Sequence, residues 1–314
     1  MRPFKHIQAS TLEEAAALAA HEDVMVIAGG TDLIGTLKDE CLPFYPNYVV
    51  DLKTIPGLDA IEETDTEIVI GTLAKLQDIA DSELVKTHAQ ALAEACQRAA
   101  SPTIRQMGTL GGNICQMHRC WYFRAPDNRF VCARKGGREC YAYQGDNRYH
   151  SILGIEGGCL AASSHDTAPA LAALGAVIVT TAREIPAEEF FAANGLRSNV
   201  LENGELVREV RVPKTAKSRF EKFALRKSID FPLVNCAVAE DGAGQVHVVL
   251  GACYPSPKRM IAAEDAVKNG ITEQSAQEAG DAAVANVMVL SRNEYKVEIA
   301  RTLVKRTLLR MVNE

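Results

Sequence analysis

Apolar runs separated by polar turns predict regular structure in the first part of the chain. Ser10–Glu13 reads S-T-L-E, a capping-box pattern that predicts a helix over 11–21. The run "VMVIAGG" at 24–30 predicts a strand that ends in a glycine pair and leads into a second helix. Tyr48–Leu52, "YVVDL", predicts the next strand. Together these segments predict a β-α-β-like unit.

The middle of the chain changes its hydrophobic period twice. The stretch 67–76, "EIVIGTLAKL", predicts a strand followed by a turn. Residues 82–100 predict one amphipathic helix that ends before Pro102, and its apolar face contains Leu84, His88, Leu92, Ala95 and Ala99. Residues 163–181 predict a turn, a short helix and a strand.

The last third begins after a linker-like stretch at 212–219, where Pro213 marks the expected boundary. Residues 220–240 and 245–254 predict the strands of a hairpin across "DGAG". A final helix is expected from about Glu294. Its apolar stripe contains Val297, Ala300, Leu303, Val304, Leu308 and Met311.

Length and composition are those of a globular protein. The 314 residues predict two domains, and the proportions of apolar (47%) and charged (24%) residues are ordinary. A net charge of −6 argues against a general nucleic-acid binder. We expect no membrane span and no signal peptide, because no apolar run is long enough for either. The expected compartment is the cytoplasm, where thiols stay reduced.

Two glycine loops, "AGGTDL" at 28–33 and "TLGGN" at 109–113, are candidates for binding a phosphate group. A glycine lets backbone N–H groups approach a ligand closely, and two such loops suit the two phosphates of one diphosphate. Neither loop matches the dinucleotide or P-loop fingerprint. The alternative is that both are tight turns with no ligand.

Nine cysteines are distributed unevenly. Cys41, Cys96, Cys236 and Cys253 stand alone in apolar surroundings and are expected in the core. The others cluster as Cys115, Cys120, Cys132, Cys140 and Cys159. Their irregular spacing is weak evidence for zinc, which usually shows paired C-x₂₋₄-C units. Four of them can hold an iron–sulfur cluster. Five unrelated thiols remain the third alternative.

The segment around these cysteines is basic. Between residues 118 and 148, seven Arg and Lys residues face three acidic ones, a local charge of +4 in a chain of −6. Nearby cations stabilise an anionic cluster with four thiolates and raise its reduction potential. A solvated basic loop that docks an acidic partner gives the same pattern, and the two interpretations are compatible.

Asp166, in "SSHDTAPALAAL", precedes the predicted helix within 163–181 and is expected either to cap this helix or to bind a ribose hydroxyl. The sequence contains no Ser-His-Asp arrangement, no H-E-x-x-H and no usefully spaced carboxylate pair. Conversion of an organic substrate by this chain alone is therefore not expected.

Taken together, "AGGTDL", "TLGGN", "SSHDTAPALAAL" and "LRKSIDFPLVNCAVA" resemble the FAD-binding medium subunits of molybdenum hydroxylases, the xanthine dehydrogenase and carbon monoxide dehydrogenase flavoprotein family. The resemblance covers nearly the whole chain. It implies an α+β fold with a two-part, vanillyl-alcohol-oxidase-like FAD domain at 1–212, with sub-parts of about 1–55 and 56–212. A C-terminal α/β flavoprotein domain would occupy 213–314.

The resemblance also implies a set of cofactor-binding residues. One loop would wrap the diphosphate, a second loop would lie opposite, Asp166 would bind the adenosine side or the loop near it, and Lys222 would approach the flavin ring. The two loops comprise Ile27, Ala28, Gly29, Gly30, Thr31, Asp32, Leu33 and Ile34, then Thr109, Gly111, Gly112 and Asn113.

The cysteine-rich segment is similar to an insertion found in only part of that family. The β subunit of 4-hydroxybenzoyl-CoA reductase and the FAD subunit of a bacterial molybdenum aldehyde oxidoreductase carry one extra 4Fe–4S cluster there. By this resemblance the insertion spans about 116–160, and Cys115 belongs to the flavin loop. The implied ligands are Cys120, Cys132, Cys140 and Cys159, with Cys159 the least secure.

The implied function is an electron-transfer subunit. A large subunit with the molybdenum cofactor and a small 2Fe–2S subunit would be its partners, and ferredoxin or another one-electron carrier would be the external partner. A zinc-stabilised binding protein and a stand-alone FAD oxidase are the alternatives. The expected location is cytoplasmic, and export with a signal-bearing partner subunit stays open.

Overall fold

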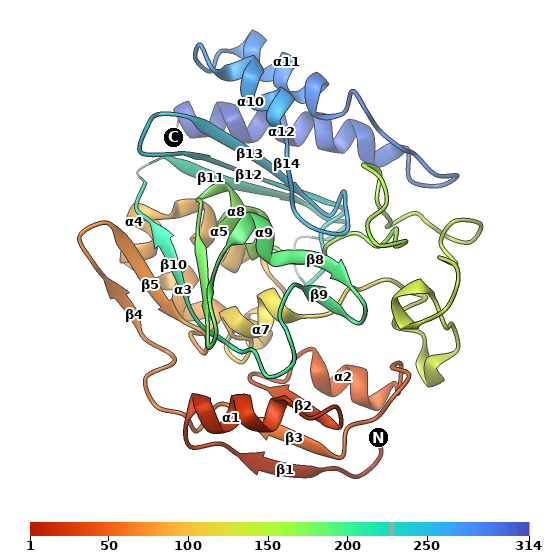
Figure 1. Ribbon diagram of the computed structural model, residues 1–314. Helices are drawn as coiled ribbons and strands as arrows, with labels where there is room; N and C mark the ends of the chain where they lie inside the picture. The colour runs from red at the N-terminus through yellow and green to blue at the C-terminus, as the bar shows by residue number, and fades with distance from the viewer. Residues whose placement is uncertain (216, 227–228, 314) are drawn as a thin grey trace.

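The computed structural model describes residues 1–215, 217–226 and 229–313, and the strands in these ranges form four sheets. Figure 1 shows the N-terminal part below, the middle of the chain in the centre and the C-terminal helices above, with residues 116–160 along one side. The same ranges contain no helix that is long and apolar enough to cross a membrane. The mixed α/β architecture agrees with the predicted fold class.

The N-terminal unit is a small parallel sheet with a helix after each of its first two strands. Its strands are β1 (Lys5–Gln8), β2 (Val24–Ile27) and β3 (Tyr48–Asp51), paired in the order β1-β3-β2. Helix α1 (Leu12–Ala19) and helix α2 (Leu33–Lys38) connect them. Parallel strands need such crossovers, so the predicted β-α-β unit is confirmed.

The predicted capping box is wrong, and the N-cap lies one residue later. Thr11, not Ser10, is the N-cap of α1, and its hydroxyl accepts a hydrogen bond from the Glu14 backbone N–H. The Glu14 carboxylate reaches back to Ser10 and accepts from its N–H at 2.8 Å and its hydroxyl at 2.7 Å. Glu14 therefore bonds the residue before the N-cap, and the reciprocal bond to the N-cap N–H that defines a capping box is not formed.

A five-stranded antiparallel sheet forms the centre of the molecule. Its strands, in spatial order, are β4 (Ile61–Glu63), β5 (Glu67–Gly71), β10 (Val207–Pro213), β6 (Val177–Thr180) and β7 (Glu184–Pro186). A small β8–β9 hairpin (Phe191–Asn194 and Arg197–Asn199) lies beside it. The helices of this part are α3 (Leu76–Asp81), α4 (Glu83–His88), α5 (Gln90–Arg98), α6 (Pro102–Arg105), α7 (Leu110–Cys115), α8 (Thr167–Ala173) and α9 (Ala187–Phe190).

The single helix predicted over 82–100 is in fact two helices. Ala89 leaves the helical conformation with φ −152° and ψ 51°, and it separates α4 from α5. A distant segment occupies the break, because Thr215 N–H donates to the His88 carbonyl and Ala91 N–H donates to the Ser218 hydroxyl. These two hydrogen bonds replace bonds within a helix. The helical period of apolar residues therefore continues through 82–100, although the helix itself is interrupted at Ala89.

The C-terminal part is an antiparallel sheet with helices on both faces. It contains β11 (Ser218–Phe223), β12 (Val234–Glu240), β13 (Val246–Gly251) and β14 (Lys258–Arg259), and the predicted β12–β13 hairpin is confirmed. One face carries α10 (Ile261–Val267), α11 (Glu273–Ala283) and α12 (Tyr295–Asn313), whereas α5 and α8 cover the other. Of the predicted α12 stripe, Val297 is half-buried and the other five residues are buried.

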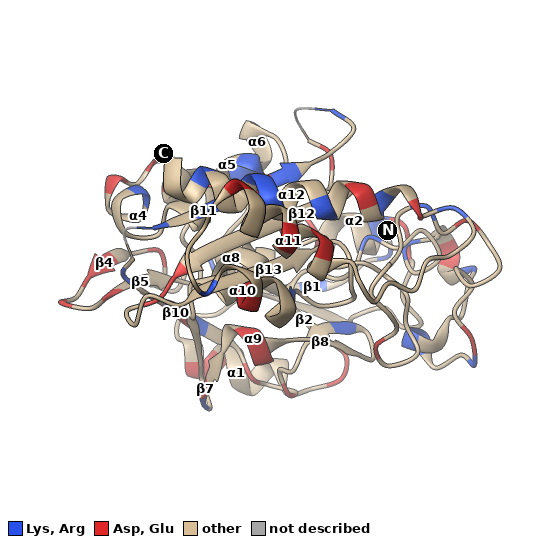
Figure 2. Cartoon of the chain, turned by 90° about the horizontal axis from the view of Figure 1, so that it is seen from above, with Lys and Arg blue, Asp and Glu red and all other residues tan. Residues whose placement is uncertain are grey.

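Residues 116–160 follow an irregular path with two short 3₁₀ turns, Pro126–Asn128 and Ala133–Lys135. The C-terminal part holds this segment in place. The Asn147 side-chain amide donates to the Ser291 hydroxyl at 3.1 Å, and its carbonyl accepts from the Arg292 N–H at 2.9 Å. Figure 2 shows acidic and basic residues interspersed along the chain rather than separated into two parts.

Candidate functional site

A cleft of about 350 Å³ runs between the N-terminal unit and the central part of the chain. Both glycine loops reach it, and so does the residue that begins α8. Eleven of the predicted cofactor-binding residues line it: Ile27, Ala28, Gly29, Gly30, Thr31, Asp32, Leu33, Thr109, Gly112, Asn113 and Asp166. Segments that are far apart in sequence therefore meet around one space.

Three predicted residues do not line this cleft. Ile34 points to solvent and is 41% exposed. Gly111 packs against β5, because a Cβ at this position would lie 1.9 Å from the Thr72 hydroxyl oxygen. Lys222 is buried behind the cleft wall, with its Nζ 2.7 Å from Asp166 Oδ2 and 3.0 Å from the Arg98 carbonyl oxygen. Lys222 contacts the cleft only through Asp166.

The first loop offers free backbone donors to the cleft. Gly30 has φ +72°, a conformation that glycine adopts without strain. Within the described ranges, the backbone N–H groups of 29–33 have no hydrogen-bond partner in the protein. A row of unpaired N–H groups beside a cleft is an arrangement that binds anions.

The second loop differs from its prediction, because its N–H groups are already used. Leu110 and Gly111 donate to the carbonyls of Ala74 and Thr72. Gly112 donates to the Thr109 hydroxyl at 3.1 Å, and Asn113 donates to the Thr109 carbonyl at 2.8 Å. This loop therefore shapes the cleft, and the N–H groups of 110–113 are not free to bind a phosphate.

Asp166 begins α8 but does not cap it, so the capping role that the sequence suggested is wrong. Its carboxylate makes no bond to the helix N–H groups. Instead it accepts from Lys222 Nζ at 2.7 Å and from the Asn235 amide at 3.0 Å. The side chains of Asp166 and Lys222 are only 5% and 3% exposed. This buried pair joins α8 to β11 and β12 at the cleft wall.

Asp32 connects the first loop to the cysteine-rich segment. Its carboxylate forms ion pairs with Arg119 at 2.9 Å and Arg124 at 2.8 Å, and it accepts a hydrogen bond from the Met117 N–H. Arg124 also donates to the Thr36 hydroxyl. Arg119 and Arg124 were recognised in the sequence as part of a basic segment. Their shared acidic partner, Asp32, lies about 90 residues earlier in the chain and was not predicted.

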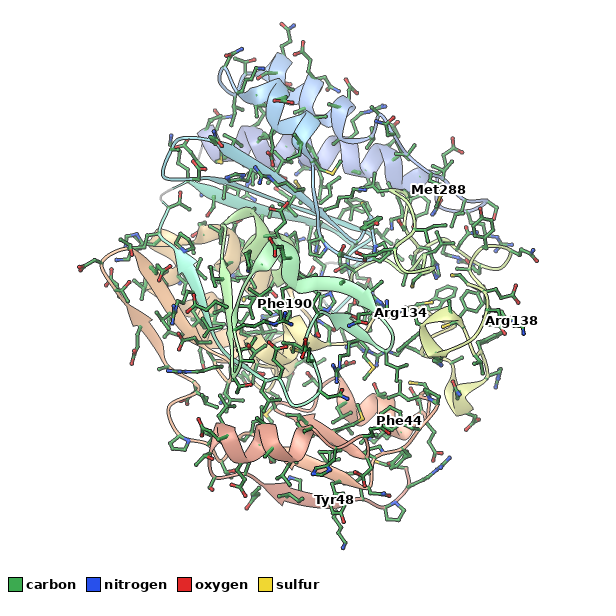
Figure 3. All side chains as sticks on the ribbon, viewed as in Figure 1. Phe44, Tyr48, Arg134, Arg138, Phe190 and Met288 are labelled. Atoms are coloured by element: carbon green, nitrogen blue, oxygen red, sulfur yellow. The ribbon has the colours of Figure 1, made fainter. Side chains whose placement is uncertain are left out.

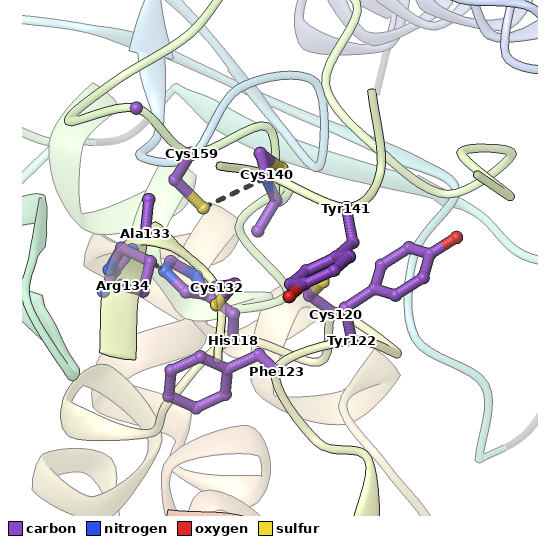
Figure 4. Close-up of a pocket in the computed structure, with 12 residues that line it drawn as sticks. His118, Cys120, Tyr122, Phe123, Cys132, Ala133, Arg134, Cys140, Tyr141 and Cys159 are labelled. Carbon is purple, nitrogen blue, oxygen red and sulfur yellow. Dashed lines mark hydrogen bonds between the residues drawn. The ribbon is translucent and has the colours of Figure 1, made fainter. Parts of the chain in front are cut away.

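A second cavity lies within the cysteine-rich segment (Figure 4). All four predicted ligands, Cys120, Cys132, Cys140 and Cys159, line it, whereas Cys115 lines the cleft instead. Within the described ranges, no three His, Cys, Asp or Glu side chains are grouped closely enough to hold a single metal ion. The cysteines therefore share a cavity but do not form a site for one ion.

Burial favours the protonated form of two of these thiols, Cys120 and Cys159. It raises the pKa of Cys120 to about 12 and also raises the pKa of Cys159. The Cys120 sulfur lies 3.3 Å from His150 Nε2. Because thiolates bind metals, metal binding here would release protons.

Three further residues beside this cavity were not singled out in the sequence. His118 is fully buried, and burial together with the Arg134 guanidinium holds the pKa of His118 well below its usual value. Arg134 is 4% exposed and Lys135 is 6% exposed. Figure 3 shows Arg134 on the inner side of the segment and Arg138 at its outer edge. A basic sequence run does not show which of its charges are buried.

Comparison with known proteins gives the class of this chain. Residues 2–215 match the family model described as the FAD binding domain in molybdopterin dehydrogenase. The aldehyde oxidoreductase FAD-binding subunit PaoB of Escherichia coli (strain K12) is 31% identical, over 100% of this chain and 98% of that protein. The carbon monoxide dehydrogenase medium chain of Hydrogenophaga pseudoflava is 26% identical over 97% of this chain and 96% of that one. The chain belongs to this FAD-binding family of the molybdopterin dehydrogenases.

Solved structures agree with this family. Carbon monoxide dehydrogenase from Hydrogenophaga pseudoflava superposes with a TM-score of 0.76 at 26% identity, covering 99% of both chains. Quinoline 2-oxidoreductase from Pseudomonas putida 86 has a TM-score of 0.74 at 22% identity, covering 99% of this chain and 97% of that one. The two-part fold with a C-terminal domain is thus the fold of known oxidoreductase subunits.

Proposed function

We propose that this chain is the FAD- and 4Fe–4S-containing electron-transfer subunit of a molybdenum-dependent hydroxylase or dehydrogenase complex. One observation carries the proposal: Cys120, Cys132, Cys140 and Cys159 line one cavity, while Cys115 lines the cleft in which we place FAD. FAD exchanges two electrons or one at a time, whereas a 4Fe–4S cluster exchanges one.

The cleft fits an extended FAD. Residues 27–34 would hold the diphosphate, because the loop at 29–33 has free N–H groups. Thr109, Gly111, Gly112 and Asn113 would shape the opposite wall. Asp166 would bind the adenosine side or the loop near it, with Lys222 holding its carboxylate from behind the cleft wall.

The proposed domains are a FAD-binding domain at 1–212 and a C-terminal domain at 213–314. The FAD domain would divide near residue 55, with the cluster-binding insertion at about 116–160. One buried cluster is confined largely to the N-terminal unit and another to the C-terminal sheet and helices, which supports this division. The largest cluster crosses the boundary near 212 and packs the FAD-binding domain against β11, β12 and β13.

The proposed partners are a large subunit with the molybdenum cofactor and a small 2Fe–2S subunit. The names of the relatives support a complex, since they denote medium chains and FAD subunits of dehydrogenases. Ferredoxin, or another acidic one-electron carrier, is the proposed external partner. The exposed Arg129 and Arg138 of the basic segment support docking of such a carrier. The proposed location is the cytoplasm.

The main alternative is a zinc site that only stabilises the segment. Zinc draws four ligands around one ion, and the described residues contain no such group. In a 4Fe–4S cluster each cysteine binds a different iron. The four cysteine sulfurs therefore lie further apart than the four ligands of a single zinc ion. Four cysteines that line one cavity without converging on one point therefore favour the cluster.

The test is metal and cofactor analysis of the anaerobically purified full chain and its variants. Wild type should contain one FAD and about four iron and four sulfide per chain. Cys120→Ser and Cys140→Ser should lose the iron and keep the FAD. Cys115→Ser is the matched control, because it changes a half-buried cysteine that lies just before the segment and outside the cavity, and it should keep the iron. Stoichiometric zinc, or iron loss in Cys115→Ser alone, would contradict the proposal.

A further inference from the structure

His118 lies in the wall of the cysteine-lined cavity and has a fixed tautomer. It is fully buried, and its Nε2 contacts Nη1 of Arg134 (Figure 4). A guanidinium can only donate hydrogen bonds. Nε2 must therefore accept, so the ring proton lies on Nδ1.

Arg134 is itself held rigidly, which keeps the His118 ring in this state. Its other nitrogens donate to the backbone carbonyls of Gly195 and Arg197, in the β8–β9 hairpin. The guanidinium therefore cannot turn away without losing these two bonds. The arrangement places an oriented Nδ1–H donor on a ring that lines the cavity.

This donor has no acceptor in the protein. Among the residues that the structure describes, nothing accepts a hydrogen bond from His118 Nδ1. A buried donor without a partner is costly, and native proteins retain one where an ion or ligand supplies the partner. The same cavity wall contains the four cysteine sulfurs. Thiolate and sulfide sulfurs of a cluster are hydrogen-bond acceptors.

We propose that His118 donates a hydrogen bond from Nδ1 to a sulfur of the iron–sulfur cluster, with Arg134 fixing the tautomer that makes this possible. This inference rests on the proposed cluster and assigns to His118 a positioning and tuning role. A hydrogen bond to sulfur stabilises the more negative, reduced cluster more than the oxidised one. His118 therefore raises the midpoint potential of the cluster, and it does not ligate iron.

The experiment compares His118→Asn with His118→Leu in the full chain. The side-chain amide of Asn can place a donor near the position of Nδ1, whereas Leu has none. Both variants remove the Nε2 acceptor of Arg134, so any difference between them reports on the donor. Iron and sulfide are counted first, and the midpoint potential is then measured by an EPR-monitored redox titration. We expect a lower potential in His118→Leu and a value near wild type in His118→Asn.

Equal potentials in wild type and both variants would overturn the assignment while leaving the proposed function intact. A wild type without iron and sulfide would overturn both. If neither variant retains the cluster, pulsed EPR of the reduced wild-type chain with ¹⁵N-labelled histidine decides. His150→Gln removes the other histidine near a ligand cysteine. A weak nitrogen coupling that persists in His150→Gln supports the donor role. No coupling, or one as large as that of a directly bound nitrogen, refutes it.

Discussion

At the residue scale, single side chains connect the two candidate sites. Asp32 belongs to the cleft loop, and its carboxylate binds Arg119 and Arg124 of the cysteine-rich segment. Gln116, at the start of the same segment, also lines the cleft. Its backbone carbonyl accepts a hydrogen bond from His165 Nε2. A few partly buried polar contacts therefore join the cleft to the start of the cysteine-rich segment.

A carboxylate at Gly30 tests the cleft loop. Gly30→Asp places a negative charge beside the free N–H groups and forces a side chain into φ +72°, which costs about 1–2 kcal/mol. We expect the variant to purify with little FAD. Gly35→Asp is the control, because it adds the same charge in α2 at an exposed position where a Cβ meets nothing within 4 Å. Full flavin absorbance in Gly30→Asp would contradict the proposal that this loop binds the diphosphate of FAD.

What the sequence predicted at the residue scale follows from local signals. Glycines between a strand and a helix, and cysteines within a basic segment, are visible in the sequence itself, and the family resemblance separated Cys115 from the other four. His118 and Lys222 were harder, because their roles depend on contacts with Arg134 and Asp166, which tertiary folding brings to them. No spacing rule shows such pairs.

At the element scale, the strands were predictable as short apolar runs between turn residues. The last helix was predictable because one face of it is buried, and burial imposes its period on the sequence. The break between α4 and α5 was not, since Thr215 and Ser218, which occupy it, come from the distant linker. The linker is therefore a structural contact as well as a boundary between the proposed domains.

The buried pair of Asp166 and Lys222 should stabilise the junction of α8 and β11. Lys222→Met leaves a buried carboxylate without its cation, which costs about 3–5 kcal/mol. Lys217→Met is the control, because its partner Glu240 is 3.0 Å away but its own side chain is 55% exposed, so the loss should be about 0–1 kcal/mol.

Urea unfolding of the FAD-free chains measures both losses in the free energy of unfolding. The double variant Asp166→Leu/Lys222→Met should recover much of the loss of Lys222→Met, since it removes the unpaired charge. Equal losses in the free energy of unfolding for Lys222→Met and Lys217→Met would show that the buried ion pair stabilises the fold no more than the exposed one.

At the scale of the whole molecule, the cleft and the cysteine-lined cavity are the two sites built from predicted residues. Asp166, a carboxylate in the cleft, is engaged by Lys222 and Asn235, and His165 is engaged by Ser163 and the Gln116 carbonyl. General acid–base catalysis needs a group that can exchange its proton with a substrate. In the proposed function, the cleft and the cavity hold two redox groups near each other.

The purified single chain should therefore pass electrons without converting substrate. Dithionite should reduce it in two spectral stages, one for the flavin and one for the cluster, and the reduced chain should pass its electrons to a viologen of suitable potential. Aldehydes, purines and aromatic thioesters should give no dye reduction until the molybdenum and 2Fe–2S subunits are added. The assay compares the single chain with the reconstituted complex at equal flavin concentration. Substrate-dependent dye reduction by the single chain, at a rate near that of the complex, would identify a stand-alone flavin oxidase instead.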